Sequence, residues 1–185
     1  MSWNKYRHGK RIHIFGASGS GTTTLGKAVA SAAKIPFLDS DDFYFDLKYS
    51  QKRAVERRNS DLEVAAAKSE SWVLSGSIDG WNSNVATLFS HLVFLNLEVE
   101  TRLTRLHQRE LNRYGAEAIV PGGAEHAHSL EFLEWAKHYE DGTREGRSLA
   151  RHESWMQTIK VPILRLNSTQ PVGVLVDKVL SFAGV

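Results

Sequence analysis

Residues 11–25 read Arg-Ile-His-Ile-Phe-Gly-Ala-Ser-Gly-Ser-Gly-Thr-Thr-Thr-Leu, an apolar run followed by a glycine-rich turn. The apolar run is typical of a short buried strand, and the residues from Thr22 onward predict a helix. Gly16, Gly19 and Gly21 let the backbone turn tightly and point successive N–H groups at one spot. The start of a helix adds a positive dipole end there. The stretch therefore predicts a strand, an anion-binding turn and a helix in direct succession.

The turn matches the phosphate-binding P-loop pattern Gly-x-x-x-x-Gly-Lys-[Ser/Thr], except that Thr22 stands at the lysine position. Thr23 falls at the position whose hydroxyl holds Mg²⁺ in this motif. A turn that merely links a strand to a helix is the alternative, but the flanking strand and helix favour phosphate binding. The expected nucleotide-binding residues here are Gly16, Ala17, Ser18, Gly19, Ser20, Gly21, Thr22, Thr23 and Thr24.

The missing lysine has different consequences for binding and for catalysis. A hydrogen bond from a charged donor contributes about 1.5–3 kcal/mol, so its loss weakens binding by about 10- to 100-fold. One well-placed donor contributes roughly 3–4 kcal/mol to a transition state that develops charge. We therefore expect nucleotide binding to survive, and fast phosphoryl transfer to need a cation from elsewhere in the chain.

Composition sets limits on the other classes of function. The 185 residues include no cysteine, which excludes disulfides and cysteine-based zinc sites and suits a reducing cytoplasm. A net charge of +2 gives no argument for nucleic acid, and no apolar run reaches the length of a membrane span. We expect a single cytoplasmic domain over 1–185, monomeric or homodimeric, with no membrane or nucleic-acid partner.

Apolar runs and helical stretches alternate along the chain. The predicted strands are 11–15, 35–39, 72–75, 91–96 and 161–166, and the predicted helices are 22–33, 51–69, 98–114, 129–140, 146–159 and 171–183. Because the strands are continuously apolar, we expect an α/β fold with a parallel sheet covered on both faces. Ligands should bind outside the carboxyl ends of the strands. We expect a lid at about 115–147, with 115–128 as a loop that turns at Pro121-Gly-Gly.

Three carboxylates follow the second predicted strand in Leu38-Asp-Ser-Asp-Asp-Phe-Tyr44. Asp41 is predicted to face the metal and to activate an acceptor, and Asp42 and Tyr44 are predicted to contact the acceptor. The alternative is that Ser40 or Asp41 caps the next helix. The third strand ends at Ser75 without a carboxylate, and Asp79 is expected to do no more than begin a turn.

Arginines form two stripes at helical spacing, at 102, 105, 109 and 113 and at 144, 147 and 151. A solvated face is the usual meaning of such a stripe. Two stripes on either side of a lid, in a chain without the P-loop lysine, favour a phosphate clamp. Lys48, Lys52, Arg53, Arg57 and Arg58 form a further basic patch, which either grips an acceptor or is a solvated face. The histidines at 126, 128, 138 and 152 suggest no metal site, and His126 and His128 are expected in the loop.

From these motifs the chain resembles P-loop kinases of the adenylate/shikimate kinase type, and within them small bacterial adenylate-kinase-like ATPases with Thr in place of the P-loop lysine. The resemblance implies a five-stranded sheet of order 2-3-1-4-5. It also implies that Gly16 to Thr24 hold the donor phosphates, that Thr23 and Asp41 hold Mg²⁺, and that 167–171 touches the base. Arg105 and Arg109 would cover the adenine, and Arg147 and Arg151 would act on the transferring phosphoryl group.

The expected function is ATP- and Mg²⁺-dependent phosphoryl transfer to a small-molecule or nucleotide acceptor. Catalysis of this kind consists of positioning and electrostatics. The alternative is a nucleotide-binding regulatory protein without phosphoryl transfer, which the absence of the lysine favours.

Overall fold

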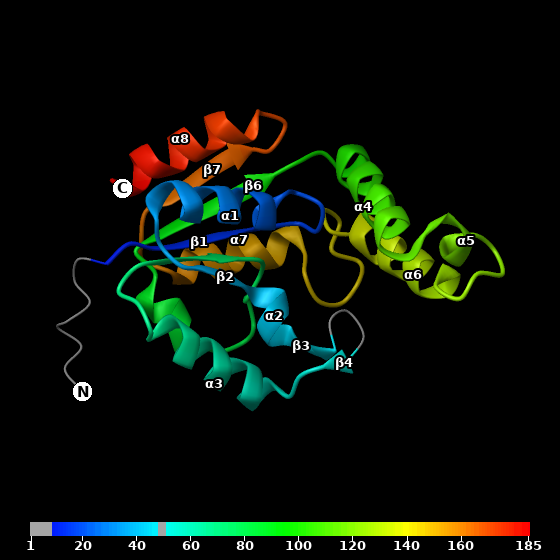
Figure 1. Cartoon of the computed structure of the whole chain (residues 1–185), viewed down its shortest axis with the longest axis horizontal. Coiled ribbons are helices and arrows are strands. Elements are labelled where there is room, and N and C mark those ends of the chain that lie inside the picture. The colour runs from blue at the N-terminus through cyan, green and yellow to red at the C-terminus, as the bar shows by residue number, and fades with distance from the viewer. Residues whose placement is uncertain (1–8, 48–50) are drawn as a thin grey trace.

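The computed structural model describes residues 9–47 and 51–185, so Lys48 of the basic patch lies outside the described residues. A five-stranded parallel sheet forms its centre (Figure 1). The strands are β1 (Arg11–Gly16), β2 (Phe37–Asp39), β5 (Trp72–Ser75), β6 (His91–Asn96) and β7 (Ile163–Asn167). Their order is β2-β5-β1-β6-β7, which is 2-3-1-4-5 when these five are numbered along the chain. This confirms the expected sheet. β2 and β7 begin after Pro36 and Pro162, which have no N–H for a ladder.

Helices α1 (Thr22–Ala33) and α8 (Val172–Ala183) cover one face of the sheet. Their apolar sides join the strands in one buried cluster that contains Ile12, Val29, Val93, Leu175 and Val179. Because α1 starts directly after β1, its packing on the sheet fixes where the glycine-rich turn lies.

The opposite face is covered by α3 (Val55–Ala66), a 3₁₀ helix at Asn84–Leu88 and α7 (Leu149–Thr158). A second cluster buries Phe15, Leu62, Trp72, Phe94 and Met156 there. The helix predicted at 51–69 is shorter than expected, because β3 (Phe45–Leu47) and β4 (Gln51–Lys52) pair as a small antiparallel ribbon before it. The one predicted at 146–159 begins later, where the Ser148 hydroxyl caps the N–H of Arg151.

Helices α4 (Val99–Tyr114), α5 (Ala116–Ile119) and α6 (His126–Lys137) extend beyond one end of the sheet (Figure 1). The prediction of a loop over 115–128 was therefore wrong in part: only a turn around Gly122, with φ of 89°, separates α5 from α6. His126 and His128 are helical residues. In the described part of the chain, no helix is long and apolar enough to cross a bilayer.

Candidate active site

The glycine-rich turn adopts the conformation that its sequence predicts. Gly19 and Gly21 have φ of 83° and 93°, a region that side chains disfavour. A Cβ on Gly16 would lie 2.4 Å from the Leu95 carbonyl oxygen, so the turn can pass β6 only as glycine. Gly21 precedes α1, and no side chain caps the helix. The first N–H groups of α1 therefore face the cavities beside the turn without a side-chain acceptor.

Thr23 and Asp39 bring a hydroxyl and a carboxylate together at the carboxyl end of β2. Thr23 Oγ1 donates to Asp39 Oδ2 over 3.3 Å, and Asp39 Oδ1 accepts the backbone N–H of Asp41 over 3.1 Å. Asp39 thereby caps α2 (Ser40–Tyr44), where the sequence suggested Ser40 or Asp41 as the cap. The carboxylate beside Thr23 is Asp39, whereas the sequence favoured Asp41, which lines the same cavities from the first turn of α2.

These oxygens fit Mg²⁺, which prefers carboxylates, hydroxyls, water and phosphate. Within 9–47 and 51–185, no group of three or more His, Cys, Asp or Glu side chains could enclose a metal. A magnesium ion at Thr23 and Asp39 would therefore need phosphate oxygens and water as further ligands, as is usual for a nucleotide-bound ion.

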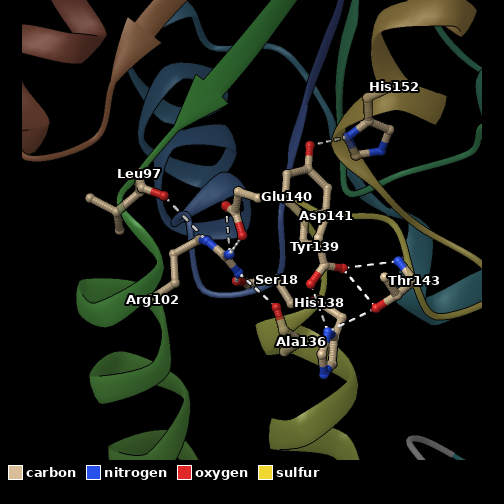
Figure 2. Close-up of polar contacts among 10 residues, drawn as sticks. All are labelled: Ser18, Leu97, Arg102, Ala136, His138, Tyr139, Glu140, Asp141, Thr143 and His152. Carbon is tan, nitrogen blue, oxygen red and sulfur yellow. Dashed lines mark hydrogen bonds and ion pairs between the residues drawn. The ribbon is translucent and has the colours of Figure 1, made fainter.

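Arg102 does not belong to a phosphate clamp, so the first arginine stripe is divided. Its side chain is fully buried, and its guanidinium donates to the carbonyl oxygens of Leu97, Ser18 and Ala136. It also holds the Glu140 carboxylate at 2.5 and 2.7 Å (Figure 2). Arg102 thus links α4 to the P-loop and to the end of α6.

The other arginines of α4 line the cavities. Arg105 donates to the hydroxyl and the carbonyl oxygen of Ser168, each over 3.2 Å, in the segment after β7. Arg109 and Arg113 border both cavities, and the Arg109 guanidinium lies 5.2 Å from the Phe132 ring centre. Arg105 therefore joins α4 directly to the 167–171 segment. The adenine contacts that the resemblance implies for these residues stay predictions.

The second stripe approaches the P-loop and the loop after β5. Arg147 Nη1 donates to the Ser18 hydroxyl over 3.2 Å. Arg151 Nε lies 2.6 Å from Asp79 Oδ2, and Arg144 lines the cavity between them and the lid. Arg147 is thus a cation that contacts the loop from which the lysine is missing.

Sequence reasoning missed a buried network beside this stripe. Asp79 does more than begin a turn: its carboxylate accepts the Ser77 hydroxyl and lies 3.5 Å from His152 Nε2. Burial favours a raised pKa at Asp79, but the adjacent His152 ring, the hydrogen bond from Ser77 and the charge of Arg151 hold the pKa of this carboxyl well below its usual range. Burial lowers the pKa of His152, so its ring is neutral. Ser77 and His152 are 75 positions apart, and no local pattern relates them.

A cavity of about 790 Å³ extends from the P-loop to the loop after β5 and to helices α4 and α6. At one end the Arg58 guanidinium lies 5.1 Å from the Tyr44 ring centre and 4.5 Å from that of Trp81. Arg58 Nε is buried without a hydrogen-bond partner. The solvated-face interpretation of the basic patch therefore fails at Arg58, although Arg53 and Arg57 do pair with Asp46 and Asp61.

A second cavity, of about 500 Å³, lies on the other side of the P-loop. It is bordered by the start of α1, the arginines of α4 and the segment after β7. Its lining includes Gly21, Thr23, Arg105, Arg109, Ser168 and Gln170.

Comparison with known proteins gives the family. No family model matches the chain. A protein of Bacillus subtilis (strain 168), described as "Uncharacterized protein YqaC", is 40% identical over 173 residues, which cover 94% of this chain and 97% of the relative. The chain belongs to the YqaC family. Nearly the whole length of this YqaC-family protein is therefore shared with its relative.

Solved structures show which fold the YqaC-family chain has. Shikimate kinase from Acinetobacter baumannii in complex with shikimate matches with a TM-score of 0.56 and 16% identity, over 97% of this chain and 95% of that chain. A gluconokinase from Sinorhizobium meliloti 1021 matches with a TM-score of 0.54 and 17% identity, over 96% and 93%. At such low identity these likenesses show the fold alone, which is that of the P-loop kinases.

Proposed function

We propose that this protein is an ATP- and Mg²⁺-dependent phosphotransferase with a variant P-loop. The observation that carries the proposal is the approach of Arg147 to Ser18, which gives the loop a cation in place of the lysine. The kinase fold and the positive φ of Gly19 and Gly21 support it.

The nucleotide would extend from the second cavity along the P-loop. Arg105 and Arg109 would cover the base opposite the 167–171 segment, and backbone N–H groups from Gly16 to Thr24 would surround the phosphates. Thr23 and Asp39, with Asp41 nearby, would hold Mg²⁺. The ion would supply charge neutralisation on the phosphate oxygens.

Arg147 and Arg151 would act on the transferring phosphoryl group. Phosphoryl transfer spreads negative charge over the equatorial oxygens, and fixed guanidinium groups stabilise it. Arg147 already contacts the loop, and Arg151 lines the same cavity from α7. Asp41 would orient the acceptor and accept its proton, with Asp42 beside it.

The acceptor is expected to be a small molecule or nucleotide that carries an anionic group. Arg58 lies beside the stacked rings of Tyr44 and Trp81, its Nε–H has no hydrogen-bond partner, and it lines the same cavity as Arg151. Guanidinium groups bind carboxylate and phosphate in a forked geometry. Tyr44 would pack against the body of the acceptor.

A nucleotide-binding regulator without transfer is the second candidate, because Thr22 leaves the loop without its own ammonium. The two candidates differ at the acceptor end of the cavity. A regulator needs ATP binding and a lid, but no saturable acceptor site at Arg58 and Asp41.

The test is a screen of anionic acceptors for ADP production, combined with calorimetry of ATP binding. We expect Arg58→Ala to raise the acceptor KM by more than about tenfold, as loss of a charged hydrogen bond does. ATP affinity should stay unchanged in this variant. Arg57→Ala is the matched control, since Arg57 pairs with Asp46 and Asp61 and should leave the acceptor KM as it is. Tight ATP binding without turnover on any acceptor would favour the regulator.

A further inference from the structure

Two adjacent residues after α6 contact side chains that bond to two separate parts of the cavity lining, Ser18 and Ser77. Glu140 pairs with Arg102, whose guanidinium also donates to the Ser18 carbonyl of the P-loop. The Tyr139 hydroxyl lies 2.7 Å from His152 Nδ1, on α7 (Figure 2). His152 in turn contacts Ser77, after β5. The chain segment that leaves the lid is therefore fixed to the nucleotide side by one residue and to the acceptor side by its neighbour.

The hydrogen bonds around His152 have one consistent direction. The Ser77 hydroxyl has a single proton, which it donates to Asp79. Ser77 Oγ must then accept from His152 Nε2, over 2.7 Å. The neutral ring leaves Nδ1 as an acceptor, and this atom takes the Tyr139 proton. Tyr139 thus selects the tautomer of His152.

The far end of the network is in the acceptor cavity. Asp79 and Arg151 both line that cavity, and Arg151 donates from Nη2 to the Asp79 carbonyl over 3.4 Å as well as pairing through Nε. Arg151 is 46% exposed, so without Asp79 its long side chain has many rotamers available. A Cβ on Gly80 would lie 2.0 Å from Arg151 Nη2, which shows how closely the guanidinium lies on this loop.

We propose that His152 is a positioning residue, which Tyr139 keeps in the Nε2–H tautomer so that Asp79 holds Arg151 toward the acceptor. This rests on the proposed phosphotransferase function and deepens it. His152 and Tyr139 touch neither nucleotide nor acceptor. They act through Asp79, and they link the segment after α6 to the loop after β5.

A merely structural role for the network makes different predictions. A buried hydrogen-bonded cluster that only stabilises the fold would lower the Tm when altered, but would leave the exposed Arg151 side chain as it was. Arg151 and His152 are neighbours on α7, so the decisive change is at Tyr139, 13 positions from His152. The positioning role requires that Tyr139→Phe be felt at Arg151 through His152, Ser77 and Asp79.

The experiment is NMR on ¹⁵N-labelled full-length protein near pH 7. In the wild type we expect a neutral Nε2–H pattern for the His152 ring and an Arg151 Nε–H resonance displaced from those of exposed arginines. His152→Gln should move the Arg151 resonance to the exposed position. Tyr139→Phe should give mixed tautomers at His152 and a partial movement of the Arg151 resonance. His138→Gln is the matched control, because His138 bonds to Asp141 and Glu134 in the same segment and should change neither signal.

Kinetics give the second measurement. We expect His152→Gln and Tyr139→Phe to lower the kcat of ATP-dependent transfer by about 10- to 100-fold, as misplacement of a positioned group does, with the KM for ATP unchanged. An absence of transfer in the wild type would overturn the proposed function, while the spectra would still decide the positioning role. An Arg151 resonance that is the same in wild type, Tyr139→Phe and His152→Gln would overturn the inference. If His152→Gln does not fold, the Tyr139→Phe spectrum decides alone.

Discussion

Thr22 removes an ammonium from a loop whose other donors are backbone N–H groups. Arg147 approaches this loop from the side of the lid, through a hydrogen bond to the Ser18 hydroxyl. If residues 115–147 act as the lid that the proposed function requires, Arg147 reaches the loop only when this lid closes, whereas a P-loop lysine is always present. The replacement would therefore couple transfer to lid closure.

If Arg147 replaces the P-loop lysine, the effects on kcat of substitutions at Thr22 and Arg147 should not be additive. Arg147→Ala should lower kcat by about 100-fold, the loss expected when one fixed donor to a charged transition state is removed. In the Thr22→Lys background, Arg147→Ala should lower kcat by less than about tenfold, because the new ammonium stabilises the same charge. Steady-state kinetics of the four proteins measure the coupling. An equal loss in both backgrounds would show that Arg147 does not stand in for the lysine.

At the scale of single elements, α4 shows how one stripe can serve two purposes. Arg102 and Arg105 lie on the same face of α4, yet Arg102 is fully buried and Arg105 is exposed. The difference comes from α6, whose Ala136 carbonyl oxygen accepts from Arg102, and from the P-loop, whose Ser18 carbonyl oxygen does the same. Helical spacing predicts which residues share a face, but not which of them another helix will cover.

Because Arg102 joins α4 to α6, we expect Arg102→Met to lower the stability of the fold strongly. The change leaves the Leu97, Ser18 and Ala136 carbonyl oxygens without their donor and Glu140 without its partner. A buried acceptor left without a donor costs about 1–3 kcal/mol, so with three such carbonyl oxygens we expect the free energy of unfolding to fall by about 3 kcal/mol. Urea denaturation measures it.

Arg105→Met is the control for the denaturation of Arg102→Met. Arg105 is exposed and donates its hydrogen bonds to Ser168, so its loss should cost about 1 kcal/mol or less. If both variants unfold at the same urea concentration, Arg102 is not the link between the P-loop and the lid.

At the scale of the whole molecule, the sheet and the P-loop could be predicted because their signals are local. Continuous apolar runs, the glycine turn at residues 16–21 and the helix after it lie within short windows of sequence. The Ser77–Asp79–His152–Tyr139 network could not be predicted, because it joins a loop after β5 to α7 and to the segment after α6. Asp39 was passed over in favour of Asp41 because sequence does not tell which carboxylate Thr23 faces.

A buried histidine in the central strand makes the stability of the whole fold depend on pH. His13 lies fully buried in β1, stacked between Phe15 and Phe89 at 5.0 and 4.7 Å, with Nδ1 3.2 Å from the Leu74 carbonyl oxygen. Burial lowers the pKa of His13 to about 3, from 6.5 in an exposed histidine. Between these values the unfolded chain binds a proton that the folded chain does not.

The contribution of His13 to the free energy of unfolding should therefore rise with pH from about 3 to 6.5 and then level off. Its slope is at most about 1.4 kcal/mol per pH unit. The neutral ring of His152, whose pKa burial also lowers, adds a slope of the same sign. In His13→Phe the slope of the unfolding free energy between about pH 4.5 and 6 should fall by the equivalent of about one proton relative to the wild type. Urea titrations at several pH values give these slopes. An unchanged slope in His13→Phe would mean that the folded protein protonates His13 as readily as the unfolded chain does, and that the centre of the sheet admits a charge.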